Sequence, residues 1–295
     1  GYGDMKCYGN SRLQTPNLDQ LAAEGIRFTN FYAGAAASTP SRAALLTGRY
    51  AERAGLQGVV DDLSVNGLES DEFTLADYLK QNNYATGIFG KWHLGCLPEH
   101  LPLRHGFNEF FGLPYSNDMW PFHPQPGHPY RALPLYDNER VVEYNPTVNH
   151  MTTRITERAT AFIDKHKNEP FLLYVPYTQP HVPLGVSDKF KGKSGEGLYA
   201  DVIMEIDWSV GEIMKTLKEN GLDDHTLVLF TSDNGPWLSY GNHGGSTGGL
   251  REGKGTTFEG GQRVPFIARM PGRIPAGKVS EQFLSALDIT PTIVE

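Results

Sequence analysis

The sequence predicts an α/β fold in which a mostly parallel central sheet carries helices on both faces. Apolar, strand-like runs alternate along the chain with segments whose apolar residues recur at helical spacing. The 295 residues can bury a sizeable core, and no Pro-, Gly- or Ser-rich linker divides them. We therefore expect one domain over residues 1–295, with any ligand bound beyond the carboxyl ends of the strands.

The individual elements follow from hydrophobic periodicity and from capping residues. Helices are predicted where apolar residues recur every three or four positions, at 15–25, 38–48, 74–81, 151–167, 199–220 and from 285 onward. Strands are predicted at 26–32, 84–90, 171–177, 226–232 and 264–270. Of these, 171–177 should be buried and 226–232 should belong to a parallel sheet.

Residues 104–134 show no regular periodicity, so they are expected to form a long irregular loop that binds a ligand. The histidines in and near this loop are expected to be structural or loop residues, namely His100, His105, His123 and His128.

Composition excludes several classes of partner. Lys and Arg number 26 against 34 Asp and Glu, and the net charge of −8 argues against nucleic acid. Cys7 and Cys96 are too few for a disulfide framework and are expected to be plain thiols. The longest apolar stretch, at 171–177, is far too short to span a membrane, and the N-terminus has no signal-peptide pattern. An anionic substrate would have to be held by local positive charge.

The stretch 38–49 places a hydroxyl, a proline and an arginine directly before an apolar helical run. Pro40 is tolerated in a first helical turn and Gly48 stops the helix, so Ser38 should lie at a helix N-terminus. Unpaired backbone N–H groups at such a terminus favour a tetrahedral oxyanion. For the short Ser-x-Pro-Ser-Arg segment alone, an ordinary serine cap before a buried helix is the better interpretation, and only the full twelve-residue string favours a site.

Polar residues follow three of the predicted strands. Lys91 and His93 lie two residues apart in an extended segment, so their side chains should share one face. His181 is presented between two prolines, and Asp233 and Asn234 offer hard oxygen ligands suited to Ca²⁺ or Mg²⁺. Each alone would usually be a solvated terminus or a turn residue, but five placements at strand ends are hard to explain as accident.

Several segments together resemble the type I sulfatases. The string STPSRAALLTGR at 38–49 is similar to the signature of that family, whose first residue is oxidised to formylglycine after translation. Further similar segments are GKWHLG at 90–95, PHVP at 180–183, SDNG at 232–235 and GKGTTFEGG at 253–261. The resemblance runs from Gly1 to about Pro291, and it implies an alkaline-phosphatase-like sandwich.

The resemblance implies a sulfuric ester hydrolase that cleaves an aryl or carbohydrate sulfate through a hydrated formylglycine at position 38. It assigns a metal, Ca²⁺ or alternatively Mg²⁺, to Asp233, Asn234 and residue 38. It also assigns roles in substrate binding and proton transfer. The negative charge of the sulfate is held by Arg42, Lys91 and Lys254, and Ser116 contacts the sulfate. His181 protonates the leaving group, and His93 deprotonates a hydroxyl. For Ser116, a turn role is an equally good interpretation.

Ser38 leaves two alternatives, because most relatives carry Cys at this position. It marks either a Ser-type enzyme with its own formylglycine-generating maturase or a Cys-to-Ser replacement. Unmodified serine has no second hydroxyl and could not turn over by the family route.

Two other functions remain open. One is a phosphatase or phosphonate hydrolase of the same superfamily, and the other is a noncatalytic binder of sulfated glycans. The resemblance implies a periplasmic, secreted or lysosomal protein. In the family, the segment similar to 1–4 follows a strand and two aspartates, and a smaller C-terminal domain is usual, so we expect a fragment truncated at both ends.

Overall fold

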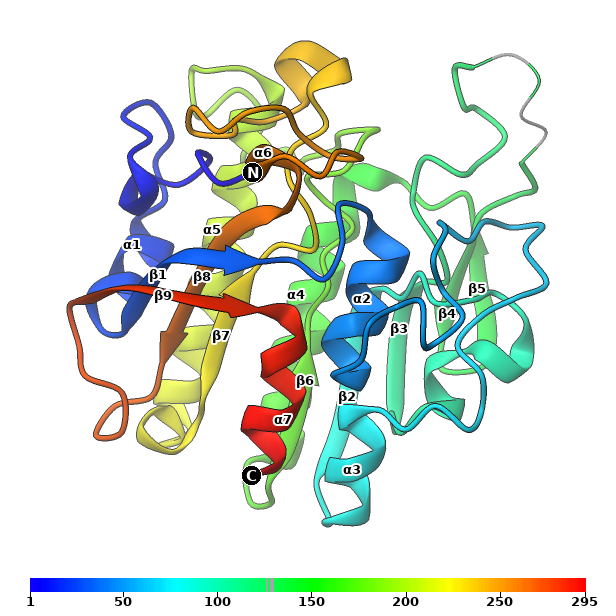
Figure 1. The fold of residues 1–295 in the computed structure, drawn as a ribbon, viewed down its shortest axis with the longest axis horizontal. Helices are drawn as coiled ribbons and strands as arrows, with labels where there is room; N and C mark the ends of the chain where they lie inside the picture. The colour runs from blue at the N-terminus through cyan, green and yellow to red at the C-terminus, as the bar shows by residue number, and fades with distance from the viewer. Residues whose placement is uncertain (126, 128–129) are drawn as a thin grey trace. The chain divides into compact units, whose positions relative to one another are not determined.

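The computed structural model describes residues 1–125, 127 and 130–295 (Figure 1). His128 lies outside these described residues. The chain divides into two compact units. The first comprises Gly1–Ala37 and Val186–Ala286, and the second comprises Ser38–Gly185 and Leu287–Glu295.

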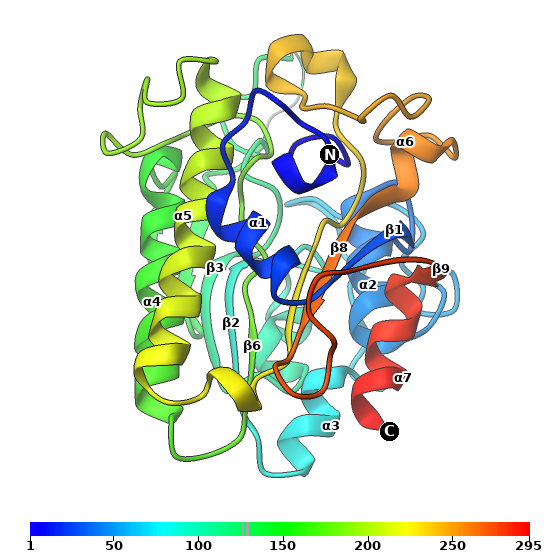
Figure 2. The same cartoon turned by 90° about the vertical axis from the view of Figure 1, so that its left-hand side faces the viewer.

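The first unit is built on a four-stranded sheet with the order β7-β8-β1-β9. Its strands are β1 (Ile26–Tyr32), β7 (Val228–Thr231), β8 (Arg263–Arg269) and β9 (Lys278–Ser285). Strand β8 runs antiparallel to β7 and β1, whereas β9 runs parallel to β1. Helices α1 (Pro16–Ala23) and α5 (Leu198–Glu219) pack together, as Figure 2 shows, and α1 also packs on β8. Leu18 and Leu21 of α1, Val210 of α5 and Ile267 of β8 are buried together in one hydrophobic cluster.

The second unit contains a five-stranded sheet with the order β5-β4-β3-β2-β6. Its strands are β2 (Ala85–Lys91), β3 (Glu109–Leu113), β4 (Pro134–Asp137), β5 (Arg140–Tyr144) and β6 (Phe171–Tyr174). Strand β2 is buried along its whole length and pairs in parallel with β3 and β6, while β3, β4 and β5 pair antiparallel. Its helices are α2 (Ser38–Thr47), α3 (Leu75–Gln81), α4 (Met151–His166) and α7 (Ile289–Val294).

Short helices complete the described secondary structure. One is the α-helical turn α6 (Glu259–Gln262). The others are 3₁₀ turns, η1 (Lys6–Tyr8), η2 (Pro98–His100), η3 (Pro102–Arg104), η4 (Val148–His150), η5 (Asp223–His225), η6 (Leu238–His243) and η7 (Ala286–Asp288). Among the described residues, no helix combines the length and the hydropathy needed to cross a membrane.

Five of the six helix predictions are confirmed to within two residues, whereas the helix expected from 285 onward begins at Ile289, after the 3₁₀ turn η7. Helix α2 begins at Ser38 and ends at Thr47. Gly48 follows with a left-handed φ of 66°, and its N–H donates to the Ala44 carbonyl. Helix α3 begins with a reciprocal capping box between Thr74 and Asp77. The strands expected at 26–32, 84–90 and 264–270 are also confirmed, as β1, β2 and β8.

The prediction of a mostly parallel sheet is wrong, because both sheets are mixed. Strand β7, expected in a parallel sheet, pairs antiparallel with β8. An apolar run fits either arrangement, so periodicity could not decide its direction. Strand β6 is half-buried rather than buried because it lies at the edge of its sheet.

The expected irregular loop at 104–134 contains a strand that sequence periodicity missed, β3. Gly112 within it argues against a strand. The structure explains this glycine, because a Cβ there would lie 1.7 Å from the carbonyl oxygen of Gly90 in β2. The glycine therefore permits the close approach of two central strands.

Candidate active site

Ser38 is placed by the start of helix α2 and is almost completely buried. Lys91, the last residue of β2, donates a hydrogen bond from Nζ to Ser38 Oγ over 3.2 Å. The Lys91 side chain is itself buried, with 2 % of the residue exposed. An ammonium group and a helix N-terminus thus meet at one hydroxyl, an arrangement that favours an anion.

Arg42 lies one turn further along α2 and is also buried. Its Nη1 donates to the backbone carbonyl of Lys91 over 2.6 Å, which ties α2 to the carboxyl end of β2. Two buried positive charges therefore lie beside Ser38. Such a pair suits the nonbridging oxygens of a sulfate group.

His93 follows β2 and has a left-handed backbone with φ of 66°. The strand ends at Lys91, so the expected alternation of side chains along an extended chain does not reach His93. Burial lowers the pKa of His93 well below its ordinary value, and the charges of Lys91 and Arg42 lower it further.

This low pKa makes His93 a neutral imidazole. Its Nε2 lies 2.9 Å from the Val60 carbonyl, which can only accept, so Nε2 carries the proton. Its Nδ1 is buried and has no hydrogen-bond partner in the described part of the chain. This nitrogen is the one that can accept a proton.

Ser116 and His181 lie together, as the resemblance implied. Ser116 Oγ is 3.4 Å from His181 Nδ1 and 3.5 Å from Nε2, which is too long for a strong hydrogen bond. His181 Nδ1 lies 2.7 Å from the carbonyl oxygen of Val182. His181 also contributes to the electrostatic field at His93. Six of the predicted site residues are thereby linked within the second unit, namely Ser38, Arg42, Lys91, His93, Ser116 and His181.

The other three predicted residues, Asp233, Asn234 and Lys254, belong to the first unit, in the segments that follow β7. Asn234 is buried, and its amide donates to the Gly235 carbonyl over 2.8 Å. The backbone N–H of Lys254 donates to the Pro236 carbonyl, and its Nζ lies 4.3 Å from the centre of the Trp237 ring.

The residues expected at strand ends belong to different sheets. Lys91 is the last residue of β2 and His181 comes after β6 in the five-stranded sheet, whereas Asp233 comes after β7 in the four-stranded one. The convergence on one pocket of the eight residues other than Ser116 stays a prediction.

The sulfatase family profile matches residues 1–295. This chain belongs to the sulfatase family. It is 44% identical over 310 residues to arylsulfatase A of Bos taurus, with 99% of this chain and 61% of the relative covered. It is 40% identical over 328 residues to human arylsulfatase G, with 100% and 62% covered. The sulfatase chain thus spans about 60% of the length of these curated relatives.

Solved structures match the sulfatase chain closely. The structure of Ps i-CgsB in complex with k-i-k-neocarrahexaose has a TM-score of 0.87 and 35% identity, covering 99% of this chain and 68% of that one. The PsFucS1 sulfatase from Pseudoalteromonas sp. has a TM-score of 0.89 and 30% identity, covering 99% and 64%. The α/β fold is therefore that of the alkaline-phosphatase-like sulfatases.

The described residues of this chain do not by themselves compose a Ca²⁺ site. Asp233 and Asn234 offer one carboxylate and one amide, whereas Ca²⁺ takes about six to eight oxygens. The carboxylate of Asp4 is already engaged by the Tyr199 hydroxyl at 2.7 Å and the Ser246 N–H at 2.8 Å. Over residues 1–125, 127 and 130–295, no three His, Cys, Asp or Glu side chains gather closely enough to hold a metal ion.

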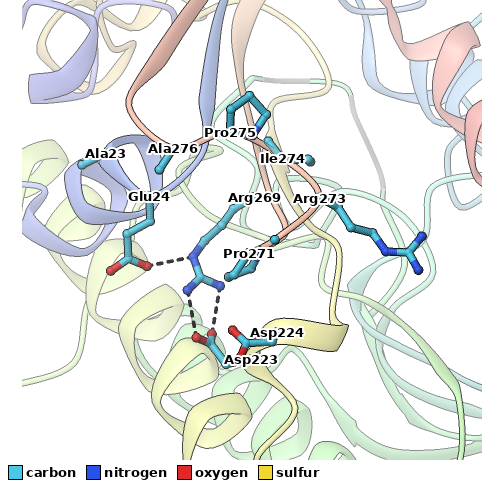
Figure 3. A pocket seen from close by; sticks show the side chains of 11 residues that line it. Ala23, Glu24, Asp223, Asp224, Arg269, Pro271, Arg273, Ile274, Pro275 and Ala276 are labelled. Atoms are coloured by element: carbon cyan, nitrogen blue, oxygen red, sulfur yellow. Dashed lines mark hydrogen bonds and ion pairs between the residues drawn. The ribbon is translucent and has the colours of Figure 1, made fainter.

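A hollow of about 660 Å³ in the first unit of the sulfatase is lined by none of the predicted site residues (Figure 3). Arg269 points into it from the end of β8. Its guanidinium is held by Glu24 at 2.8 Å and by both carboxylate oxygens of Asp223 at 2.8 and 2.9 Å. These carboxylates compensate the positive charge of Arg269.

Sequence reasoning missed the residues that support His181. Asn117 is completely buried, and its amide donates to the carbonyls of His181 at 3.3 Å and Pro183 at 3.2 Å. Its neighbour Asp118 lies near the His181 ring. The available signal was the position of both residues directly after Ser116 in the sequence.

Proposed function

We propose that this chain carries the catalytic residues of a sulfatase that hydrolyses aryl or carbohydrate sulfate esters. The observation that carries the proposal is the hydrogen bond from buried Lys91 to Ser38 at the start of α2. It brings positive charge and helix N–H groups to the hydroxyl that the family converts into its catalytic aldehyde. The names of the relatives, which include arylsulfatases and an N-acetylgalactosamine-6-sulfatase, support this choice of substrate class.

Maturation of Ser38 requires a formylglycine-generating partner. The partner removes two electrons and two protons from the serine side chain, leaving an aldehyde. When present, formylglycine supplies a hydrated aldehyde whose two hydroxyls serve to attack sulfur and to release sulfate. By its resemblance to the family, we place the protein in the periplasm, in a lysosome or outside the cell.

Residues of the second unit have separate roles in ester cleavage. Arg42 and Lys91 hold the sulfate oxygens and stabilise the charge that develops on them. His181 gives a proton to the departing oxygen, and Ser116 beside it contacts the sulfate group. Neutral His93 takes a proton at Nδ1, the nitrogen that faces away from Val60. The resemblance to the family assigns Lys254 the same charge-holding role.

Mass spectrometry and kinetics together test the proposal. The peptide containing residue 38, from protein made in its native host, should be lighter than the serine form by two hydrogens. The same protein should hydrolyse 4-nitrophenyl sulfate faster than 4-nitrophenyl phosphate. Unmodified serine without turnover would instead support a binder of sulfated glycans, and faster phosphate hydrolysis would support a phosphatase.

A further inference from the structure

Buried polar atoms without hydrogen-bond partners gather on the two stretches that carry Ser116 and His181. In the described part of the chain, they include Oδ1 of Asn117, Oδ1 of Asp118, Oγ1 of Thr178 and Oε1 of Gln179. Buried polar atoms are almost always hydrogen-bonded in folded proteins. All four atoms belong to residues within three positions of Ser116 or His181.

Asp118 is the charged member of this group. Its Oδ1 lies 3.9 Å from Nδ1 of His181, and only 13% and 14% of the two side chains are exposed. Because both groups are largely removed from water, their electrostatic interaction is screened less than at a surface. The carboxylate therefore favours the protonated form of the His181 ring.

Positive charge also lies near this pair of histidines. The Lys91 and Arg42 charges lower the pKa of the His93 ring, and His181 interacts electrostatically with that same ring. Positive charge near an imidazole disfavours the imidazolium that a proton donor requires. The Asp118 carboxylate offsets that effect at the residue that has to donate.

The geometry also specifies which proton is given up. His181 Nδ1 lies 2.7 Å from the Val182 carbonyl, an acceptor, so Nδ1 keeps its proton. The transferable proton is then on Nε2 and exists only in the imidazolium form. Asn117 fixes the His181 backbone by its bond to the carbonyl, so the ring is held while Asp118 sets its charge.

We propose that Asp118 is a positioning residue that acts through His181 and keeps its ring protonated, so that Nε2 can donate to the leaving oxygen. This inference rests on the proposed role of His181 as the proton donor. Asp118 acts through His181 and makes no contact with substrate.

The direct test is an NMR titration of the His181 ring in protein labelled with ¹³C-histidine, with the signal assigned from its loss in His181→Gln. Asp118→Asn should lower the titration midpoint of His181 by about one pH unit. Asp118→Glu should restore most of the shift, and Asp71→Asn, which removes an exposed carboxylate of the same unit, should leave the midpoint unchanged. Asp118→Ser is the second neutral variant if the amide is not accommodated. An unchanged midpoint in the folded neutral variant overturns the proposal.

Leaving-group dependence separates this inference from the proposed function. His181→Ala should slow hydrolysis of an alkyl sulfate by about a hundredfold, and of 4-nitrophenyl sulfate far less, because a good leaving group hardly needs a proton. Asp118→Asn should show the same pattern at about tenfold, with the alkaline limb of kcat/KM moved to lower pH. Equal losses on both substrates in His181→Ala overturn the donor role itself. If His181→Ala slows the alkyl sulfate far more than 4-nitrophenyl sulfate but Asp118→Asn does not, only the role of Asp118 is overturned.

Discussion

Individual histidines in this chain differ because their surroundings differ. His93 and His105 are both buried, and burial is the main cause that lowers the pKa of each. His93 lies among site residues, so its neutral form is available to accept a proton. His105 stacks on Trp92 with 5.8 Å between ring centres, and its neutral form simply packs in the core.

The His105 ring makes the stability of the protein depend on pH. Burial lowers the pKa of His105 from 6.5 to about 4. Between these values the unfolded state binds a proton that the folded state does not, so the free energy of unfolding falls as pH falls. We expect a loss of about 1–2 kcal/mol between pH 7 and pH 5, measured by urea unfolding.

A pair of variants isolates this contribution. His105→Gln should show a smaller decrease between pH 7 and pH 5 than the parent chain. His150→Gln, which changes an exposed histidine of the same unit, should retain the full decrease. The same pH dependence in His105→Gln and the parent would contradict the assignment.

At the scale of elements, the positions of the catalytic candidates depend on how β2 is packed. Its seven residues are all buried, and it ends at Lys91. The close approach of Gly112 in β3 to Gly90 in β2 sets the spacing of these strands directly before that lysine. Helix α2 is then joined to the same strand end by the bond from Arg42 to the Lys91 carbonyl.

Gly112→Ala should therefore destabilise the protein strongly. The new methyl group would lie 1.7 Å from a backbone oxygen, so the two strands would have to separate. We expect a loss of about 2–4 kcal/mol in the free energy of unfolding. Gly58→Ala is the control, because nothing lies within 4 Å of the added atom, and it should change stability by less than about 0.5 kcal/mol. Similar effects of the two substitutions would show that the strands can adjust.

At the scale of the whole molecule, an acidic chain concentrates positive charge at its candidate site. The net charge is −8, yet Arg42 and Lys91 are buried beside Ser38. The overall charge therefore does not report the charge of the substrate, which depends on the local field.

The metal requirement can be measured on the chain of residues 1–295. Because Asp233 and Asn234 provide only one carboxylate and one amide, we expect Ca²⁺ to bind no more tightly than about 10⁻⁴ M in calorimetric titration. Asp233→Asn should weaken even this binding. Micromolar affinity that survives Asp233→Asn would show that other ligands form the site.

The sequence by itself determined the elements whose signals are local. Capping residues and periodicity located α2, α3, α4 and α5, and the motif at 38–49 identified the family, later supported by the match over residues 1–295. It also named Ser38, Lys91 and His181, which the structure links within one unit through direct contacts or shared neighbours.

Only the tertiary structure decided the direction of strand pairing and the surroundings of each side chain. Strand β1 pairs with β8 across more than two hundred positions, Ile26 facing Ala268, and no local pattern specifies such a partner. Asp118 and His181 are likewise distant in sequence but lie 3.9 Å apart in space. Periodicity reports which face of a segment is apolar, whereas the charge of a buried imidazole depends on neighbours that only folding brings together.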